Sequence, residues 1–209
     1  MDEDVSIINT NTRNEKIKSF FINNKNKLIF GIIILLVGIV GFYSFDKYQI
    51  NKKQQVSDTF NLITMEYSEN NKEKTTTKLI EIINEKDSTY SPLSLYFIID
   101  NELISDQKNI NELFDILIDQ TPLDDEIKNL VIYKKALFNA DQSSEGDLLN
   151  LLNPLINSKS VWKSHALYLM AEYFYAKEQN QKSKEFFNQI ISLENPNPDI
   201  RLQTEKRLN

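Results

Sequence analysis

The chain has 209 residues, no cysteine, and a formal net charge of −6. Residues 1–45 contribute +1 to that total, so residues 46–209 carry −7, and they are numerous enough for one domain with its own core. An acidic domain without a basic stripe is a poor nucleic-acid binder, and the lack of cysteine excludes disulfides and thiolate chemistry.

Residues 1–27 precede the most apolar part of the chain. Residues 1–12 are polar and aperiodic, which predicts a disordered tail. The stretch EKIKSFFIN, residues 15–23, places Ile17, Phe20 and Phe21 on one side of a short helix. This pattern predicts an amphipathic helix at a membrane surface, with an unstructured tether as the alternative.

Residues 28–45 contain no charged side chain and predict a transmembrane helix. A helix of this length covers about 27 Å, close to the ~30 Å hydrocarbon core of a bilayer. Lys25 and Lys27 lie on one side, and aromatic residues gather at the other. No small-x-small cleavage site follows, so an uncleaved anchor is favoured over a signal peptide, and the flanks argue against a buried soluble helix.

The basic residues around this segment favour a cytoplasmic N-terminus. Five precede it and three follow it within about 20 residues, the distance over which such charges set orientation. They are Arg13, Lys16, Lys18, Lys25 and Lys27 before the segment, and Lys47, Lys52 and Lys53 after it. The C-terminal part would then lie outside the cytoplasm.

Three of the chain's four glycines, Gly31, Gly38 and Gly41, fall in or at the end of this segment. Small residues let membrane helices approach closely, so the three are candidates for contact with a partner helix. Membrane helices are also enriched in glycine in general, which is the alternative interpretation.

The rest of the chain predicts an all-α protein. Residues 46–72 read as a helical linker, because Val56, Phe60, Ile63 and Tyr67 recur at helical spacing. Residues 73–209 read as helix pairs, and no Asn-Gly, Asp-Gly or Gly-Gly hairpin signal occurs. The expected helices cover residues 75–86, 91–104, 109–120, 122–140, 144–157, 160–178, 181–193 and 197–208.

Capping residues and prolines suggest several of these boundaries. Ser91 and Thr121 each stand before a proline and are expected N-caps. Pro154 is expected to kink its helix or to end it near Asn153. Successive helix pairs of about 30–40 residues are the signature of a helical solenoid.

The segment ALYLMAEYFYAKEQNQKSKEFFNQIISLENP, residues 166–196, resembles a tetratricopeptide repeat. Ala171 matches the small position of the first helix, and Phe187 the aromatic position of the second. Large apolar positions are matched by Leu167, Met170 and Phe174. The departures are Glu178 where a turn glycine is common, and Ser183 and Ile190 where alanine is usual.

The layout as a whole resembles the YfgM family, over about residues 13–209. The segment KIKSFFINNKNKL precedes a single span, a helical linker and degenerate repeats follow, and Trp162 opens the first helix of the late repeat. The resemblance implies a bacterial inner-membrane protein with a periplasmic repeat domain. It also implies contact with the SecYEG translocon and with periplasmic chaperones such as PpiD.

No constellation for catalysis, cofactor binding or metal binding emerges from the sequence. His165 is the only histidine and has no cysteine or second histidine at ligand spacing, so a packing role is favoured. Asp124 and Asp125 read as an acidic first turn of a helix. With one glycine after residue 41, no glycine-rich phosphate loop can be formed.

The sequence therefore predicts a non-enzymatic membrane adaptor that binds proteins through its repeats. The residues expected to pack the repeat or to line a concave groove are Trp162, Tyr168, Ala171, Phe174 and Phe187. A self-associating scaffold of cell-wall or division complexes, built as a homo-oligomer of the same repeats, is the first alternative. An enzyme of unknown type is the second.

Overall fold

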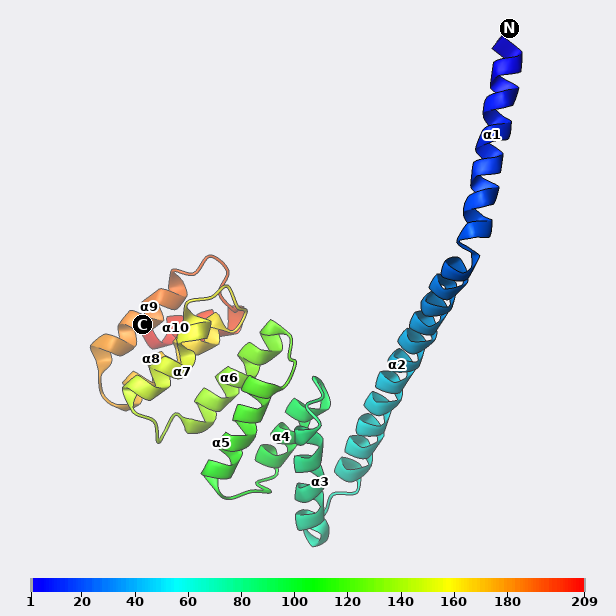
Figure 1. The fold of residues 1–209 in the computed structure, drawn as a ribbon. Helices are drawn as coiled ribbons and strands as arrows, with labels where there is room; N and C mark the ends of the chain where they lie inside the picture. Colours follow the sequence, from blue (N-terminus) through cyan, green and yellow to red (C-terminus); the bar gives the residue numbers. More distant parts are fainter. Residues whose placement is uncertain (1, 209) are drawn as a thin grey trace. The chain divides into compact units, whose positions relative to one another are not determined.

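The computed structural model describes residues 2–208, and the side chains of residues 13–208. Over this range the chain is all-helical, in agreement with the sequence (Figure 1). It divides into two compact units, residues 1–55 and residues 56–209.

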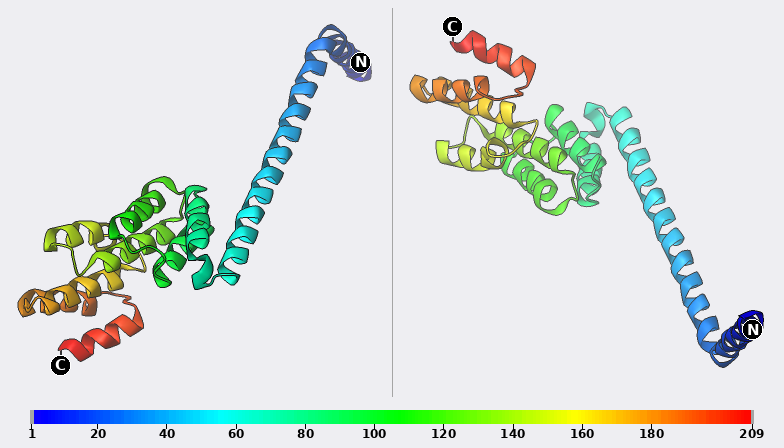
Figure 2. Two further views of the ribbon diagram at one scale, coloured as in Figure 1. Left: turned by 90° about the horizontal axis from the view of Figure 1, so that it is seen from below. Right: turned by 90° about the horizontal axis from the view of Figure 1, so that it is seen from above.

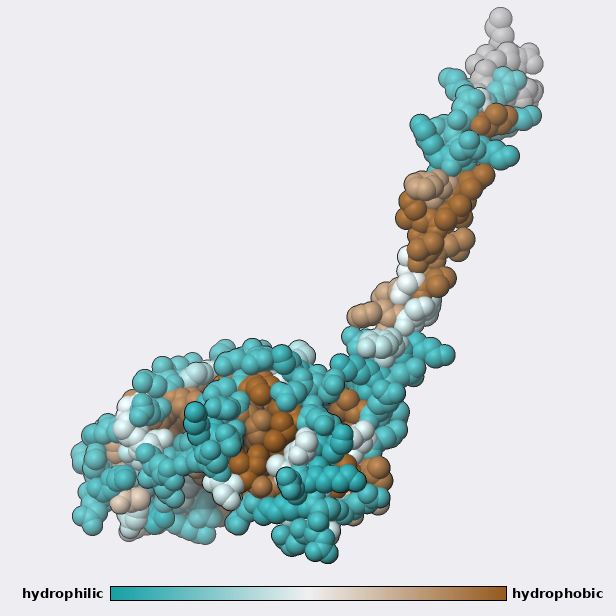
Figure 3. Space-filling model, turned by 60° about the horizontal axis from the view of Figure 1, so that its bottom comes forward, coloured by the Kyte–Doolittle hydropathy of each residue, from teal (hydrophilic) through white to brown (hydrophobic). Residues whose placement is uncertain are grey.

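The first unit contains α1 (Asp2–Asn23) and most of α2 (Lys25–Met65), with a turn at Asn24. The disordered tail expected over residues 1–12 is wrong from Asp2 onward, because α1 already begins there; this stretch has no glycine or proline to interrupt a helix. The apolar side chains of residues 29–50 of α2 are exposed, and none is buried in the most apolar window of the helix (Figure 3).

The C-terminal turns of α2 belong to the second unit. Val56 is buried, and Phe60 and Ile63 pack against the first core cluster. The Ser57 hydroxyl lies 2.7 Å from the Tyr90 hydroxyl, which adds a polar contact to α4. The compact repeat unit thus begins at Val56, inside the segment expected to be a linker.

The second unit continues with short helices stacked in chain order (Figure 2). They are the 3₁₀ turn η1 (Glu69–Asn71), α3 (Lys72–Asn84), α4 (Tyr90–Asp100), α5 (Gln107–Asp115), the π-helical turn η2 (Ile116–Gln120), α6 (Asp125–Asn139), α7 (Glu145–Ile156), α8 (Lys163–Ala176), α9 (Asn180–Ile191) and α10 (Pro198–Leu208). We call α4, α6 and α8 the first helices, and α5, α7 and α9 the second helices.

The core is a run of three apolar clusters rather than one centre. Ile118 packs against the first and second clusters, and Ile156 and Phe186 pack against the second and third. Each cluster therefore depends on its neighbours, as expected for a solenoid in which each unit buries its apolar face on the next.

The predicted N-cap at Ser91 is wrong. Helix α4 begins at Tyr90, and the Asp87 carboxylate accepts hydrogen bonds from the Thr89 and Tyr90 amides at 2.8 and 2.7 Å. Ser91 lies inside the helix, fully buried, and its hydroxyl donates to the Ile82 carbonyl. The Asp87 carboxylate bonds the free amides at the start of α4, so Ser91 is not needed as a cap. The Ser91 hydroxyl instead links α4 to α3.

Thr121 is not a cap either, because α6 begins later, at Asp125, with Asp124 in the capping position. The Thr121 hydroxyl donates instead to the Ile116 carbonyl. Asp125 and Glu126 then give α6 the acidic first turn that suits the helix dipole.

Helix α7 is capped by Ser144, whose hydroxyl accepts from the Asp147 amide at 3.2 Å. The end expected near Asn153 is wrong, because α7 continues through Pro154 to Ile156. Proline removes only its own amide from the ladder, and the Asn157 amide still bonds the Asn153 carbonyl at 3.1 Å.

Glu178 occupies the left-handed conformation that ends α8, with φ 61°. Its amide bonds the Tyr175 carbonyl, and the Gln179 amide bonds the Phe174 carbonyl at 2.9 Å. This is a Schellman motif with a glutamate where glycine is preferred. Glu178, which replaces the glycine that is common at this point of the repeat, is therefore in a strained backbone conformation.

Replacing Glu178 with glycine should stabilise the protein by about 0.5–1 kcal/mol. The side chain is exposed, so the substitution relieves the left-handed strain and removes no packing, and the added freedom of the unfolded chain offsets part of that gain. Chemical denaturation of the full chain in detergent measures the difference. Glu185→Gly, at an exposed position within α9, is the control and should destabilise by about 1 kcal/mol. Equal effects of the two substitutions would contradict this account.

Candidate protein-binding groove

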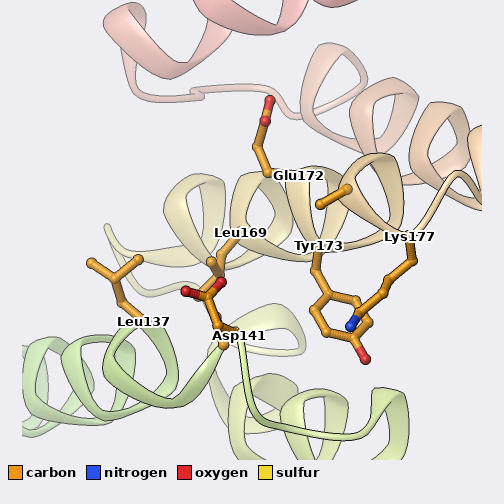
Figure 4. Close-up of a pocket in the computed structure, with 8 residues that line it drawn as sticks. Leu137, Asp141, Leu169, Glu172, Tyr173 and Lys177 are labelled. Carbon is orange, nitrogen blue, oxygen red and sulfur yellow. The ribbon is translucent and has the colours of Figure 1, made fainter.

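A hollow of about 390 Å³ lies between the first helices α6 and α8. Its residues come from the C-terminal end of α6, the turn after it, and the C-terminal half of α8 (Figure 4). They are Leu137, Ala140, Asp141, Leu169, Glu172, Tyr173, Ala176 and Lys177. The two segments are about 30 residues apart in the chain, and the stacking of the helices brings them together.

Tyr173 fixes one wall of this hollow. Its hydroxyl donates to the Ser143 carbonyl at 3.1 Å, which ties α8 to the loop before α7. The Lys177 ammonium lies 5.6 Å from the centre of the Tyr173 ring, and its side chain runs beside that ring (Figure 4). A cation over an aromatic face is stabilised there, which restrains Lys177.

Exposed apolar side chains extend the hollow along α6. Ile127 is 40% exposed and Leu137 51%, and Leu130 between them is half-buried. Spacings of three and ten residues from Ile127 place all three on one stripe of the helix. Brown side chains gather near the middle of the repeat domain in the space-filling view (Figure 3). Exposed apolar side chains that recur on one side of a helix are typical of protein-binding sites.

Most charges near the hollow are already paired. Glu172 points away from it in Figure 4 and accepts two hydrogen bonds from Arg207 of α10, at 2.8 and 2.7 Å. Arg207 also lies 4.6 Å from the centre of the Tyr175 ring. Asp141 is exposed at the edge of the hollow, and among the described residues no salt bridge to it is found.

The N-terminal half of the contact between α6 and α8 is aromatic. Trp162 stacks on Tyr133 with ring centres 5.9 Å apart, and its indole N–H donates to the Glu126 carbonyl at 3.1 Å. The ring centre of His165 lies 5.0 Å from that of Trp162, and burial is the main cause that lowers the pKa of this imidazole. His165 is therefore a neutral packing residue at physiological pH.

The five repeat residues singled out by the sequence lie around α8 but do not line the hollow. Ala171, Phe174 and Phe187 are buried in the core. Tyr168 is half-buried against Phe187, with ring centres 5.7 Å apart, and burial is the main cause that raises its pKa. Trp162 and Tyr168 are the two that reach the surface.

Sequence reasoning missed Leu137 and Asp141. The signal was present, because Leu130 and Leu137 are seven residues apart, on the side of α6 opposite the buried Ile132 and Ala136. A second apolar stripe on a helix whose first stripe already faces the core indicates a binding surface.

Gly31, Gly38 and Gly41 lie on α2 with open space around them. A Cβ atom added at any of the three would meet no atom within 4 Å. Within the described part of the chain there is also no group of three histidine, aspartate or glutamate side chains that could hold a metal ion.

Replacing Ala171 with glutamate should lower the free energy of unfolding by about 3 kcal/mol or more. The new carboxylate would be buried between α8 and α9 without a partner. Thermal or chemical denaturation of the full chain is the measurement, with Ala176→Glu at an exposed position of the same helix as the control. An unchanged melting temperature for Ala171→Glu would show that this side of α8 does not pack as described.

The comparisons with known proteins agree with this architecture. The family described as tetratricopeptide repeat-like domain matches residues 18–153. A comparison with curated proteins gave no match, and neither did a comparison with solved structures. The matched residues include the apolar part of α2 and every helix from α3 to α6, together with most of α7. Because the match covers more than half of its length, the chain belongs to the tetratricopeptide repeat-like domain family.

Proposed function

We propose that this protein is a membrane-anchored adaptor that binds other proteins through its repeat domain, as an ancillary subunit of the Sec translocon. The observation that carries the proposal is the presence in one chain of an exposed apolar helix and a tetratricopeptide-like repeat domain. The first holds the protein at a bilayer, and the second offers a surface on which partners can assemble.

Residues 28–45 of α2 form the proposed uncleaved anchor. Nearly all of their apolar side chains are exposed, which is costly in water and favourable in lipid. Phe42, Tyr43 and Tyr48 lie at the end nearer the repeat domain, where an aromatic belt meets the headgroups. Residues 1–27 would then lie in the cytoplasm, and the repeat domain on the far side of the bacterial inner membrane.

The partners are proposed from the resemblance to the YfgM family, whose layout this chain follows. SecYEG would contact the anchor, and a periplasmic chaperone such as PpiD would contact the repeats. The groove between α6 and α8 supports a binding role for the repeats, because it combines exposed apolar side chains with an exposed carboxylate.

Cross-linking in intact cells, followed by purification in mild detergent, tests this function. The adaptor proposal requires translocon subunits or periplasmic chaperones among the cross-linked products. Recovery of the protein itself, or of division and cell-wall proteins, would support the scaffold alternative and overturn the proposal.

A reporter that is active only in the periplasm, fused after Asn209, should be active. The five-to-three excess of basic residues before the anchor keeps the N-terminus in the cytoplasm and sends the repeat domain across. Reporter activity in whole cells is the measurement, and a reporter placed before Arg13 is the control. Activity at the N-terminal position alone would reverse the orientation and remove the proposed periplasmic partners.

Replacing Gly31 and Gly38 together with leucine should reduce recovery of the membrane partner by about fivefold or more. The two glycines are seven residues apart on one side of α2, and leucine side chains there would hold a partner helix away. Insertion and partners of the repeat domain should be unaffected, since leucine favours the bilayer. Ile32→Leu with Ile39→Leu is the matched control. Normal recovery of the membrane partner by the glycine variant would leave these glycines without a contact role.

A further inference from the structure

We infer that the groove between α6 and α8 selects partner segments in which a basic residue adjoins a large apolar residue. This inference rests on the proposed function, because it names the kind of partner that the repeat domain takes. The occupant is an unfolded or extended protein segment, and it is recognised by one apolar side chain and one cation.

The apolar part of the site is the hollow itself. Leu137, Leu169 and Tyr173 supply its walls, and Ala140 and Ala176 leave space between them. About 390 Å³ accommodates one large side chain together with some of its backbone. Leu137 is half exposed in the absence of a partner, so an apolar side chain seated beside it removes apolar surface from water on both molecules.

The charged part is Asp141. It lines the hollow together with Leu137 and Leu169, whereas Glu172 points away from the hollow toward α10 (Figure 4). Arg207 neutralises Glu172 through two hydrogen bonds, and Tyr173 engages Lys177. Asp141 is thus the one charge lining the hollow that has neither an ionic nor an aromatic partner among the described residues.

The lysines around the hollow are held by other groups and form no salt bridge with Asp141 among the described residues. Lys134 of α6 lies 4.6 Å from the centre of the Tyr96 ring of α4, and Lys135 pairs with Asp115. Residues 46–209 carry a net charge of −7, which also attracts basic segments over longer distances.

Fluorescence anisotropy with the full chain in detergent tests the preference. The probes are three short labelled peptides: one with phenylalanine between lysines, one with phenylalanine between glutamates, and one with serine between lysines. The first should bind at least threefold more tightly than the second, in keeping with a single exposed ion pair. It should also bind more tightly than the third, since serine cannot fill the hollow.

Variants of Asp141 separate its charge from the general acidity of the domain. Asp141→Asn should remove most of the preference for lysine, and Asp141→Lys should reverse it toward the glutamate peptide. Asp119→Asn makes the same change of charge at an exposed position after α5, and it should leave the preference unchanged. Leu137→Asp should weaken binding of the phenylalanine–lysine peptide despite the added negative charge, whereas Leu149→Asp, at an exposed position of α7, should not.

Equal binding of the lysine and glutamate peptides, tighter binding of the glutamate peptide, or no binding of either would overturn the inference. An equal effect of Asp119→Asn and Asp141→Asn would also overturn it, by assigning the preference to overall charge. In each of these cases the adaptor function stands or falls separately, on the partners recovered by cross-linking in cells.

Discussion

The C-terminal part of the repeat domain depends on the packing of the first helix α8 against neighbours on three sides. In α8, seven of the 14 residues are buried, and they serve two core clusters at once. The helix pairs with α9, rests on α7 and α6, and is covered by α10 through the pair of Arg207 and Glu172. Only a narrow stripe of such a helix is left for solvent. The residues on that stripe are free to bind a partner without any cost to the core.

This constraint explains why exposed leucines on α6 are informative. Ile132 and Ala136 already satisfy the core on one side of the helix, so Leu137 contributes little to folding in the unbound state. A large apolar side chain that is half exposed to water can instead be buried when a partner binds. By the same reasoning Ala171 and Phe187 stabilise the fold rather than bind a partner, because they are fully or almost fully buried.

The helices could be predicted from the sequence because local signals agree with the fold. Apolar residues recur at helical spacing in most segments, and Ser144 caps α7 as its position before an acidic turn suggests. Boundaries were less predictable where two residues compete for one role. Asp87 rather than Ser91 holds the start of α4, and only the three-dimensional position of Ile82 explains why Ser91 is inside the helix.

The groove could not be predicted in the same way. Leu137 and Asp141 are brought to Tyr173 by the stacking of α6 on α8, and no local pattern encodes that distance. The turn at Glu178 shows a related limit: the repeat pattern marks it as a turn position, but a glutamate there does not by itself predict a positive φ. The hydrogen bonds that close the end of α8 hold it in a conformation that its own preference disfavours.

The central claim is that the exposed apolar stripe of α6, with the groove between α6 and α8, is the protein-binding surface of a membrane-anchored repeat domain. A photo-cross-linking amino acid placed at position 137, in intact cells, tests it most directly, with position 149 on the second helix α7 as the comparison. We expect discrete cross-linked partners at position 137 and few or none at position 149. Equal cross-linking at both positions, or partners at position 149 alone, would contradict the claim.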